Sequence, residues 1–421
     1  MEGGGRSKCI IGGGVDPTVM TSTIQDLPDS ILINIISRLR MKSAKRCSAV
    51  CKAWYRILKD EATSRYMESC YDGSSSFALL SIALALSSTT VSAYVVAAES
   101  SSEEDTVGCA RFVLEGAPTV LGCCNDVLLC QGLESVYFVW EPLGGNDNWV
   151  PLPPLKYESI DRFLCGIAAH SDGSFTVIHI AGCVRWQPAH RLSVQTFSNH
   201  KHNWVWKEEV MYLPAGRVFN WESTYYPQGI MYKGFMFWLG ETHSLFGVAD
   251  PYHAADGEGS SASCVPLLID LPPKFVYKNN ERLEICRGNL TILQMSEWPT
   301  PCGTVSVWIL LDDDDHCRWL LHKHVSLRNV FQQPPLDECV LPLYQQRVEL
   351  LGSNPSDHNI IYFRVWMTVF SLDFSTMALQ HVFHYPPDTW LRGHSVTALT
   401  YKPKWRPAPV LAFAVASLFK F

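Results

Sequence analysis

One short run of the sequence concentrates side chains that could bind a metal ion. Four aspartates, Asp312 to Asp315, are followed directly by His316 and Cys317. Zinc sites usually take four ligands from two spaced pairs, and calcium loops alternate their ligands around a glycine. Four successive aspartates cannot all point at one ion. The run therefore indicates a solvated hairpin loop between the apolar segments WILL and WLLH, and we predict no metal site.

Histidines at close spacing are further candidate ligands. They form the pairs His200 with His202, His322 with His324, and His381 with His384. Such spacing more often places two side chains on one face of a strand than it builds a metal site. We therefore predict that none of these pairs holds a metal.

Motifs for nucleophilic or phosphate chemistry are missing from the sequence. No G-x-S-x-G, P-loop or G-x-G-x-x-G segment follows a strand pattern. A cysteine and a histidine could still meet in space, because the chain has 15 Cys and 14 His. Most buried cysteines are packing residues, however. We predict no catalytic residue, no cofactor and no enzyme activity of the chain's own.

The composition indicates a folded chain with more than one domain. Its 421 residues exceed what one hydrophobic core usually serves, and 47% of them are hydrophobic. The net charge of −7 argues against a surface that binds nucleic acid. There is no C-x-x-C pair and no apolar signal at the start, MEGGGRSKC, so we expect reduced thiols in the nucleus or cytoplasm. The longest apolar runs fall short of the roughly 20 residues of a membrane span, which predicts no membrane insertion.

The composition and the spacing of apolar residues divide the chain into four stretches. Residues 1–22 contain GGG twice and are expected to be a disordered leader, and residues 23–69 have helical spacing. Residues 70–106 are expected to be a linker with one apolar segment, FALLSIALAL, which could be a strand or a buried helix. Residues 107–421 carry short β-branched and aromatic runs between turn residues, which are typical of strands.

The strand runs repeat in units of four. One unit runs from Gly229 to about Leu271, another from Leu283 to Leu327, and a third from Val348 to Phe383. Four phrases rich in proline, NWVPLPP, MYLP, LIDLPP and HYPP, mark strand exits or edges, because proline cannot donate to a strand ladder. The pattern predicts a β-propeller of six or seven blades. The fold class is thus α+β and multidomain, with small N-terminal helices before a mostly β domain.

Tryptophans are dense in the β part of the chain. They are Trp204, Trp206, Trp221, Trp238, Trp308, Trp319, Trp366 and Trp390. The simplest interpretation is that they pack between blades. Trp221 and Trp390, which lie on turns, are the stronger candidates for ligand contacts, because propeller ligands meet loops at one face.

The helical stretch is basic and apolar at once. From Leu27 to Lys59 it has eight Lys or Arg and one acid, Asp29. The spacing predicts a helix with Ile31, Leu32, Ile35, Ile36 and Leu39 on one face, a second helix from Ser43 through Leu58, and a third begun by Asp60 and running through Ala62, Tyr66 and Met67. Three short helices bury too little area to be stable alone, which favours a partner with an acidic surface.

These residues also carry a family resemblance. The pattern L-P-x-x-I-L-x-x-I-x-x-R-L, followed by K-S and V-C-K-x-W, resembles the F-box of plant F-box proteins. The segments VYFVWEPLGGNDNWVPLPP and GIMYKGFMFWL resemble strands of the F-box-associated, kelch-like domain. The resemblance implies that residues 23–69 dock on the acidic Skp-type adaptor of an SCF ubiquitin ligase, and through it reach the cullin and RING subunits. It implies that residues 107–421 hold an as yet unknown protein substrate.

The adaptor-binding residues implied by the resemblance are Leu27, Pro28, Ile31, Leu32, Ile35, Leu39, Val50, Cys51 and Trp54. Two alternatives stay open at this point. One is a propeller enzyme or sugar-binding module whose helices are incidental. The other is an F-box protein that acts as a scaffold or transcriptional cofactor outside ubiquitination.

Overall fold

A computed structural model gives the three-dimensional structure of the chain. It describes residues 27–39, 47, 50–60, 62–63, 66–67, 78–84, 90–97, 109–115, 119–125, 127–132, 136–141, 149–155, 163–170, 173–182, 190–199, 204–219, 228–239, 244–250, 266–272, 275, 281–296, 303–313, 316–327, 330, 348–385 and 398–401. The expected leader, residues 1–22, lies outside these ranges.

The described strands form six antiparallel sheets of four strands each. Each sheet is given from its inner to its outer strand. The first sheet consists of β24 (Ala398–Tyr401), β1 (Ala78–Leu84), β2 (Thr90–Ala97) and β3 (Cys109–Glu115), and the second of β4 (Thr119–Cys124), β5 (Val127–Gln131), β6 (Tyr137–Trp140) and β7 (Trp149–Pro151). The third consists of β8 (Phe163–Ala169), β9 (Phe175–Gly182), β10 (Arg191–Ser198) and β11 (Lys207–Tyr212), and the fourth of β12 (Ile230–Tyr232), β13 (Phe235–Leu239), β14 (Ser244–Ala249) and β15 (Leu267–Asp270). The fifth consists of β16 (Glu281–Cys286), β17 (Asn289–Met295), β18 (Thr304–Asp313) and β19 (His316–Ser326), and the sixth of β20 (Val348–Asn354), β21 (Asp357–Val365), β22 (Thr368–Asp373) and β23 (Ala378–His384).

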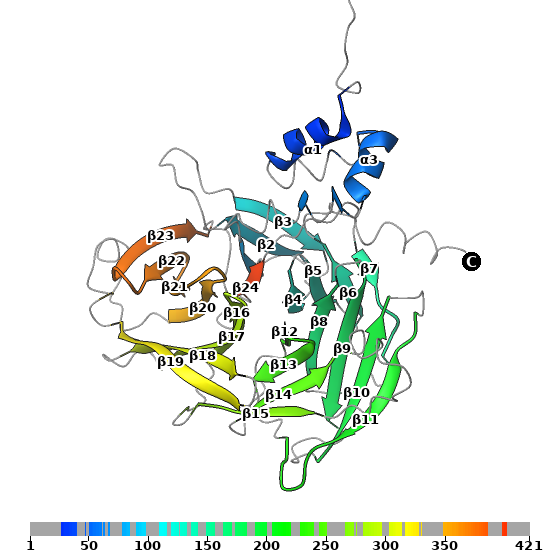
Figure 1. Cartoon of the computed structure of the whole chain (residues 1–421). Coiled ribbons are helices and arrows are strands. Elements are labelled where there is room, and N and C mark those ends of the chain that lie inside the picture. The colour runs from blue at the N-terminus through cyan, green and yellow to red at the C-terminus, as the bar shows by residue number, and fades with distance from the viewer. Residues whose placement is uncertain are drawn as a thin grey trace, which may run out of the picture.

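The six sheets stand around a common centre as the blades of a propeller (Figure 1). The inner strands β24, β4, β8, β12, β16 and β20 each lie beside the next, and β20 lies beside β24 again. The ring is closed by β24, which comes from the C-terminal part of the chain and pairs with β1. The prediction of a small helical region followed by a mostly β, kelch-like propeller is therefore confirmed.

The β domain begins earlier than the expected boundary at residue 107. Strands β1 and β2 lie within residues 70–106, the stretch expected to be a linker, and both belong to the sheet that closes the ring. Strand β1 lies within the apolar segment FALLSIALAL. Of the two alternatives for this segment, a strand or a buried helix, the structure shows the strand.

The proline-rich phrases mark the outer edge of the sheets. Strands β7, β11, β15 and β23 are each the outermost strand of their sheet, and each ends within or directly before one of the four phrases. An outermost strand has one edge without a partner strand. Proline, which lacks an N–H, can stand on that edge without the loss of a hydrogen bond between strands. The three four-stranded units expected at Gly229–Leu271, Leu283–Leu327 and Val348–Phe383 correspond to three whole sheets.

Neighbouring sheets are held together by apolar side chains and by tryptophan N–H groups. Continuous buried clusters join the second sheet to the third, the third to the fourth, the fourth to the fifth and the fifth to the sixth. Across these seams, Nε1 of Trp206 donates to the Pro153 carbonyl at 2.7 Å, and Nε1 of Trp238 donates to the Cys165 carbonyl at 3.1 Å. Nε1 of Trp319 donates to the Asp270 carbonyl at 2.8 Å. These three indoles pack between blades, as the sequence analysis predicted.

The helical region contains α1 (Asp29–Ser37) and α3 (Lys52–Lys59), and residues 62–63 and 66–67 are also helical. The continuous second helix expected from Ser43 through Leu58 is wrong, because Cys51 is extended and α3 begins after it. Asp60 caps the third helical segment as predicted, since its Oδ2 accepts from the Thr63 backbone N–H at 3.1 Å.

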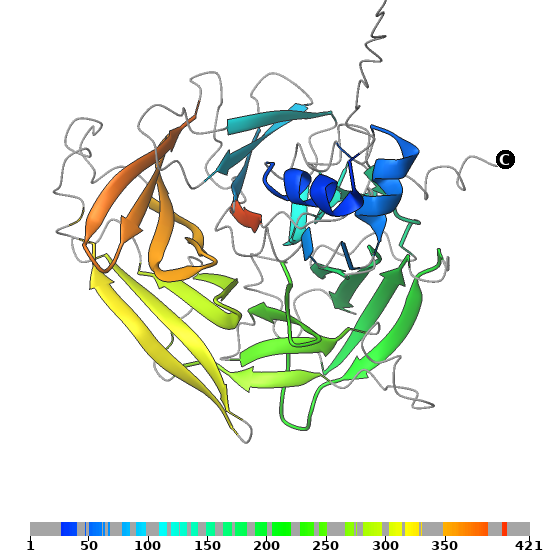
Figure 2. The same cartoon turned by 45° about the horizontal axis from the view of Figure 1, so that its top comes forward.

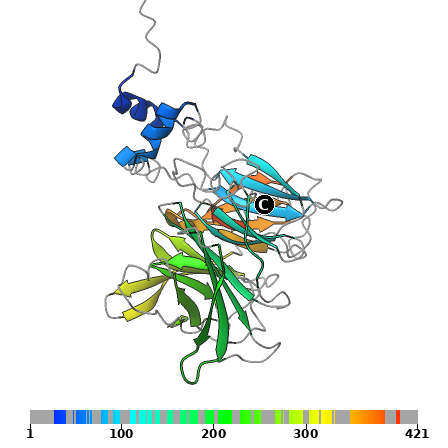
Figure 3. The same cartoon turned by 90° about the vertical axis from the view of Figure 1, so that its right-hand side faces the viewer.

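Helices α1 and α3 lie outside the ring of sheets (Figures 1 and 2). Figure 3, a side view, shows them in blue on one side of the ring.

The propeller has two faces. Within each sheet the turn between the first and second strands lies on one face, and the turn between the second and third strands lies on the other. Strand β1 is a second strand, so the chain enters it from the former face. None of the described helices is long and apolar enough to cross a membrane.

Candidate partner-binding surface on the helices

The helical region has a small core of its own. Leu32 and Ile36 on α1 pack with Trp54 and Leu58 on α3 and with Met67, and none of these side chains is more than 9% exposed. Every member of the cluster comes from the helical region. Among the described residues the region therefore has a core separate from that of the propeller, and several of its other side chains are exposed.

An apolar stripe runs along the outer side of α1. Ile31, Ile35 and Leu39 recur every fourth residue, and they are 47%, 43% and 37% exposed. This spacing places Ile31 and Ile35 on one side of α1, and Leu39 follows shortly after the helix ends at Ser37. Pro28, directly before α1, is also exposed, and Val50, directly before Cys51 and α3, is 63% exposed. We call Pro28, Ile31, Ile35, Leu39 and Val50 the apolar stripe.

The predicted adaptor-binding residues thus fall into two groups. The five residues of the apolar stripe are exposed, whereas Leu32 and Trp54 are buried and Leu27 and Cys51 are partly buried against the core. The single apolar face expected on α1 is wrong in this respect, because Leu32 and Ile36 face inward while their neighbours face outward. In the third helical segment Met67 is buried, but Tyr66 is 47% exposed.

Basic side chains surround the helices. Arg38, Lys52, Arg56 and Lys59 are exposed, and Asp29 is the acidic residue of the first turn of α1. The other basic residues of the predicted patch, Arg40, Lys42, Lys45 and Arg46, lie outside the described residues. An acidic partner surface would complement the charge of those that are described.

The structure describes several of the candidate metal ligands. Asp313 pairs with His316 across the end of the β18–β19 hairpin, so the aspartate run lies at a hairpin as predicted. His324 Nδ1 is 2.8 Å from the Ser306 hydroxyl, and His384 Nδ1 is 2.9 Å from that of Thr368. His200 and His202 lie outside the described residues. In the described part of the chain no three His, Cys, Asp or Glu side chains are arranged to hold a metal ion.

One buried histidine resembles part of a catalytic triad but has the wrong geometry. His170 Nε2 lies 3.0 Å from the Thr176 hydroxyl and 3.6 Å from Asp250 Oδ2. A triad needs the hydroxyl and the carboxylate on opposite nitrogens of the ring. Here both approach the same nitrogen, so the group is a structural link between β8, β9 and β14.

The buried cysteines are poor nucleophiles. Burial raises the pKa values of the Cys130 and Cys165 thiols far above the ordinary value, and that of Cys286 to about 12. A thiol in this state stays protonated at neutral pH, and the thiolate is the reactive form. The Cys286 thiol instead donates to the Asn354 carbonyl at 3.0 Å.

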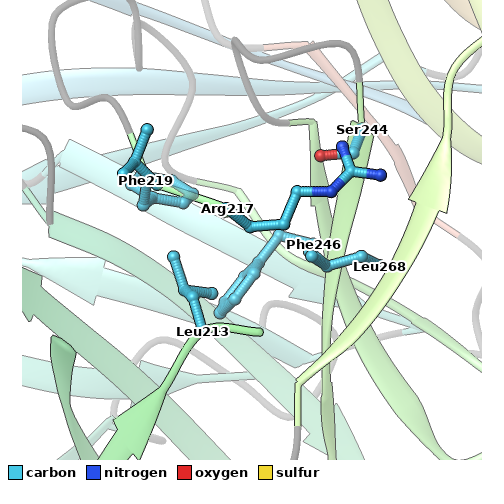
Figure 4. A pocket seen from close by; sticks show the side chains of 7 residues that line it. Leu213, Arg217, Phe219, Ser244, Phe246 and Leu268 are labelled. Atoms are coloured by element: carbon cyan, nitrogen blue, oxygen red, sulfur yellow. The ribbon is translucent and has the colours of Figure 1, made fainter. Parts of the chain in front are cut away.

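Two features on the propeller differ from the sequence analysis or were missed by it. Trp366 was expected to pack between blades, but it is 70% exposed and has a positive φ of 55° in the tight turn between β21 and β22. Trp221 and Trp390 lie outside the described residues. The second feature is a pocket beside Arg217 after strand β11 (Figure 4). The sequence offered only a weak signal for it, an arginine after the turn segment PAG.

Comparison with known proteins agrees with the helical unit and the β domain. Residues 24–67 match the F-box-like family. The chain therefore combines an F-box-like N-terminal domain with a β-propeller. It is 26% identical over 165 residues to an F-box/kelch-repeat protein of Arabidopsis thaliana, a match that covers 38% of this chain and 42% of that protein. The resemblance to plant F-box proteins is confirmed.

Two further relatives match parts of the chain. A second F-box/kelch-repeat protein of Arabidopsis thaliana is 25% identical over 150 residues, which cover 35% of this chain and 37% of the relative. F-box/SPRY domain-containing protein 1 of Culex quinquefasciatus is 35% identical over 51 residues, which cover 12% of this chain and 20% of the relative. The chain thus matches less than half of the length of each of these relatives.

Among solved structures, prolyl oligopeptidase B from Galerina marginata overlaps 73% of this chain and 40% of its own length at 6% identity, with a TM-score of 0.33. Hsv2 of Kluyveromyces lactis overlaps 68% of this chain and 70% of its own length at 10% identity, with a TM-score of 0.31. TM-scores this low carry no argument about the chain.

Proposed function

We propose that the chain is the substrate-recognition subunit of an SCF-type ubiquitin ligase, in the nucleus or the cytoplasm. Its F-box-like helices dock on a Skp-type adaptor, which connects them to the cullin and RING subunits, and its propeller holds a protein substrate. The observation that carries the proposal is the apolar stripe. Ile31, Ile35 and Leu39 are exposed on a unit that matches the F-box-like family and has already closed its own core.

The physical reason for docking is the area that the stripe leaves in water. Burial of apolar surface contributes about 25 cal/mol per Å², which amounts to roughly 1.5 to 3 kcal/mol for each large aliphatic side chain that becomes fully buried. The basic rim at Arg38, Lys52, Arg56 and Lys59 would steer and orient an acidic adaptor. Contiguous exposed apolar side chains are typical of interaction sites, and the stripe thus supports the proposed docking.

The chain's contribution to ubiquitin transfer would be positional. A substrate held near the conjugating enzyme that carries ubiquitin reacts at a high effective concentration. This role requires a rigid frame, but it requires no catalytic side chain on this chain. The closed propeller provides such a frame, and the buried thiols and the His170 cluster described above have no catalytic geometry.

We expect the double variant Ile31→Asp with Ile35→Asp to lose the adaptor. Each aspartate places a charge in an apolar interface, and we expect about a tenfold loss of affinity per site. The measurement is a pull-down of the full chain with a purified Skp-type adaptor and cullin, quantified by titration. Because both positions are exposed, the variant should keep its thermal midpoint.

Leu320→Asp on strand β19 is the matched control, because Leu320 is 48% exposed and lies on the propeller. It should bind adaptor and cullin like the unmodified chain. Equal capture by the double variant and the unmodified chain would contradict the proposal. Capture of adaptor without cullin would instead indicate an F-box protein that acts outside ubiquitination.

A further inference from the structure

Two histidines from different sheets meet at the seam between the fifth and the sixth sheet. The ring centroids of His322 on β19 and His358 on β21 lie 5.5 Å apart, and the ring planes are inclined by 56°. His358 is only 6% exposed and His322 is half-buried. Within the described part of the chain, the buried Nε2 of each ring finds no hydrogen-bond partner. The two imidazoles therefore contact each other where water has little access.

Irregular strand pairing brings both side chains to this seam. Leu321 and Lys323 pair with adjacent residues of β18, so His322 between them is the extra residue of a β-bulge. The pairing of β21 with β20 is also irregular at its start, where His358 has no paired partner on β20. A bulge changes the direction in which a side chain points and increases the twist of its strand. The contact between the rings thus depends on the local shape of both strands.

The same seam is fastened by Arg287, in the turn between β16 and β17. Its backbone N–H donates to the Pro355 carbonyl at 2.7 Å, and its Nε donates to the Ser356 carbonyl at 2.8 Å. Its Nη2 lies 3.5 Å from Asp357 Oδ1. Arg287 therefore places a permanent positive charge beside the end of β21 that carries His358.

The surroundings of His322 disfavour its protonated form. Burial is the largest cause that lowers the pKa of His322, and the positive charges of Lys323 and Arg287 lower it further. The hydrogen-bonding side chain of Asn359 and the carboxylate of Asp357 act in the opposite direction but do not outweigh the other causes. His322 is therefore neutral at pH 7.

The surroundings of His358 act in the same way. Burial lowers the pKa of His358 most, followed by the charge that His322 would carry and by that of Arg287, while Asp357 raises it. The Asp357 carboxylate is already engaged, because its Oδ1 accepts from the backbone N–H of Asn359 at 3.0 Å and from its side-chain amide at 2.9 Å. Both imidazoles of the pair are thus held neutral at pH 7.

We propose that the His322–His358 pair is an acid-sensitive latch between the fifth and the sixth sheet. As neutral rings the two side chains pack against each other. Once protonated, they would place two like charges in a largely buried contact that already faces Arg287 and Lys323, which favours separation of the rings. The apolar cluster that joins these two sheets has no titratable member, so the opening should stay local. This latch belongs to the propeller and does not depend on the proposed function.

The direction of the effect follows from the lowered pKa values. When the seam opens, each imidazole regains the ordinary pKa of about 6.5, so the open form takes up protons more readily than the closed form. The stabilising contribution of the neutral pair is fully present above this value and is lost as the pH falls below it. Each histidine can change the opening equilibrium by up to about tenfold between pH 7.5 and pH 5.5.

Hydrogen exchange of the full chain at pH 7.5, 6.5 and 5.5, corrected for the intrinsic exchange rate, tests the latch. Amides in the middle of β19 and at the start of β21 should lose about ten- to a hundredfold of their protection between pH 7.5 and pH 5.5, whereas those of β9 should not. His322→Gln with His358→Gln cannot take up the protons and should lose this pH dependence. Glu284 acts at the same seam in the opposite direction, but it is present in both chains.

The matched control is His324→Gln, because His324 is exposed on the same strand. This variant should keep the pH dependence of the unmodified chain. Protection of β19 and β21 that does not change with pH, or an unchanged pH dependence in the double glutamine variant, would overturn the inference.

A second measurement needs no variant, so it decides the matter even if the double variant fails to fold. Exchange of the hydrogen on the imidazole C2 carbon, followed by mass spectrometry of the unmodified chain against pH, gives the pKa of each histidine. The pKa values of His322 and His358 should both lie below 6.5. A value at or above 6.5 for either ring would contradict the latch.

Discussion

Leu58→Ala should unfold the helical unit while the propeller stays folded. Leu58 is fully buried in a core of only five closely packed side chains, and truncation of a buried leucine costs about 2 to 5 kcal/mol. Three short helices have little stability to lose. The five-residue core shares no member with the propeller, so the loss should remain local.

Hydrogen exchange measured by mass spectrometry on the full chain checks this result. In Leu58→Ala, amides of α1 and α3 should exchange about a hundredfold faster or more, while those of β17 and β21 keep their protection. Ile31→Ala is the matched control, because Ile31 is 47% exposed and its loss leaves the core intact. Unchanged exchange in α1 and α3 of Leu58→Ala would show that the helices depend on contacts other than this core.

Glu284→Gln should change how the stability of the propeller depends on pH. Glu284 on β16 is buried against the sixth sheet, where its Oε2 accepts from the Ser353 N–H at 2.8 Å and from the Ser353 hydroxyl at 2.7 Å. Burial raises the pKa of Glu284 to about 7, although these bonds and the nearby charge of Arg282 act to lower it. The folded chain therefore holds a proton that the unfolded chain releases at lower pH.

The direction of the effect follows from the raised pKa. The stabilising contribution of protonated Glu284 is fully present below about pH 4.5 and is lost as the pH rises through about 7. At 1.36 kcal/mol per pKa unit, the free energy of unfolding should fall by about 3 kcal/mol over this range because of this residue. Glutamine cannot titrate and still accepts from Ser353, so the variant should lack this part of the pH dependence.

Urea unfolding followed by tryptophan fluorescence at pH 4.5 and pH 8 measures the difference. The free energy of unfolding of Glu284→Gln, relative to that of the unmodified chain, should rise by about 3 kcal/mol between the two pH values. Glu209→Gln on the exposed face of β11 is the control and should follow the unmodified chain. The same difference at both pH values would mean that folding does not raise the pKa of Glu284.

Local pattern predicted the existence of α1 but not which of its apolar residues face outward. Ile31 and Leu32 are adjacent apolar residues on one broad stripe, yet Leu32 is 3% exposed and Ile31 is 47% exposed. The choice depends on where α3 packs, and spacing within one helix does not contain that information. The break at Cys51 was missed for a similar reason, since apolar spacing continues across it.

The β domain was predictable where its strands are short and bounded by turn residues. The hairpin GIMYKGFMFWL folds as β12 and β13 around Lys233 and Gly234, both with positive φ. By contrast, the sequence left β1 undecided between strand and helix and placed β2 in a linker, and it did not predict that β1 pairs with β24, about 300 residues further along the chain. A contact of that sequence separation leaves no local signature.

The Arg217 pocket belongs to the part of the structure that sequence could not supply. Its residues come from three separate segments of the chain, and Phe246 and Leu268 are ordinary strand residues. Only the propeller topology brings them to one face. The four proline-rich phrases, in contrast, identified the outer strands without any tertiary information, because the chemistry of proline is local.

Photochemical carbene footprinting of the full chain, with and without a purified Skp-type adaptor, is the most direct test of the central claim. The account predicts that the adaptor suppresses labelling of Ile31, Ile35 and Leu39, while Leu320 on β19 is labelled as before. Unchanged labelling of the apolar stripe in the presence of a bound adaptor would contradict the claim that this surface is where the partner docks.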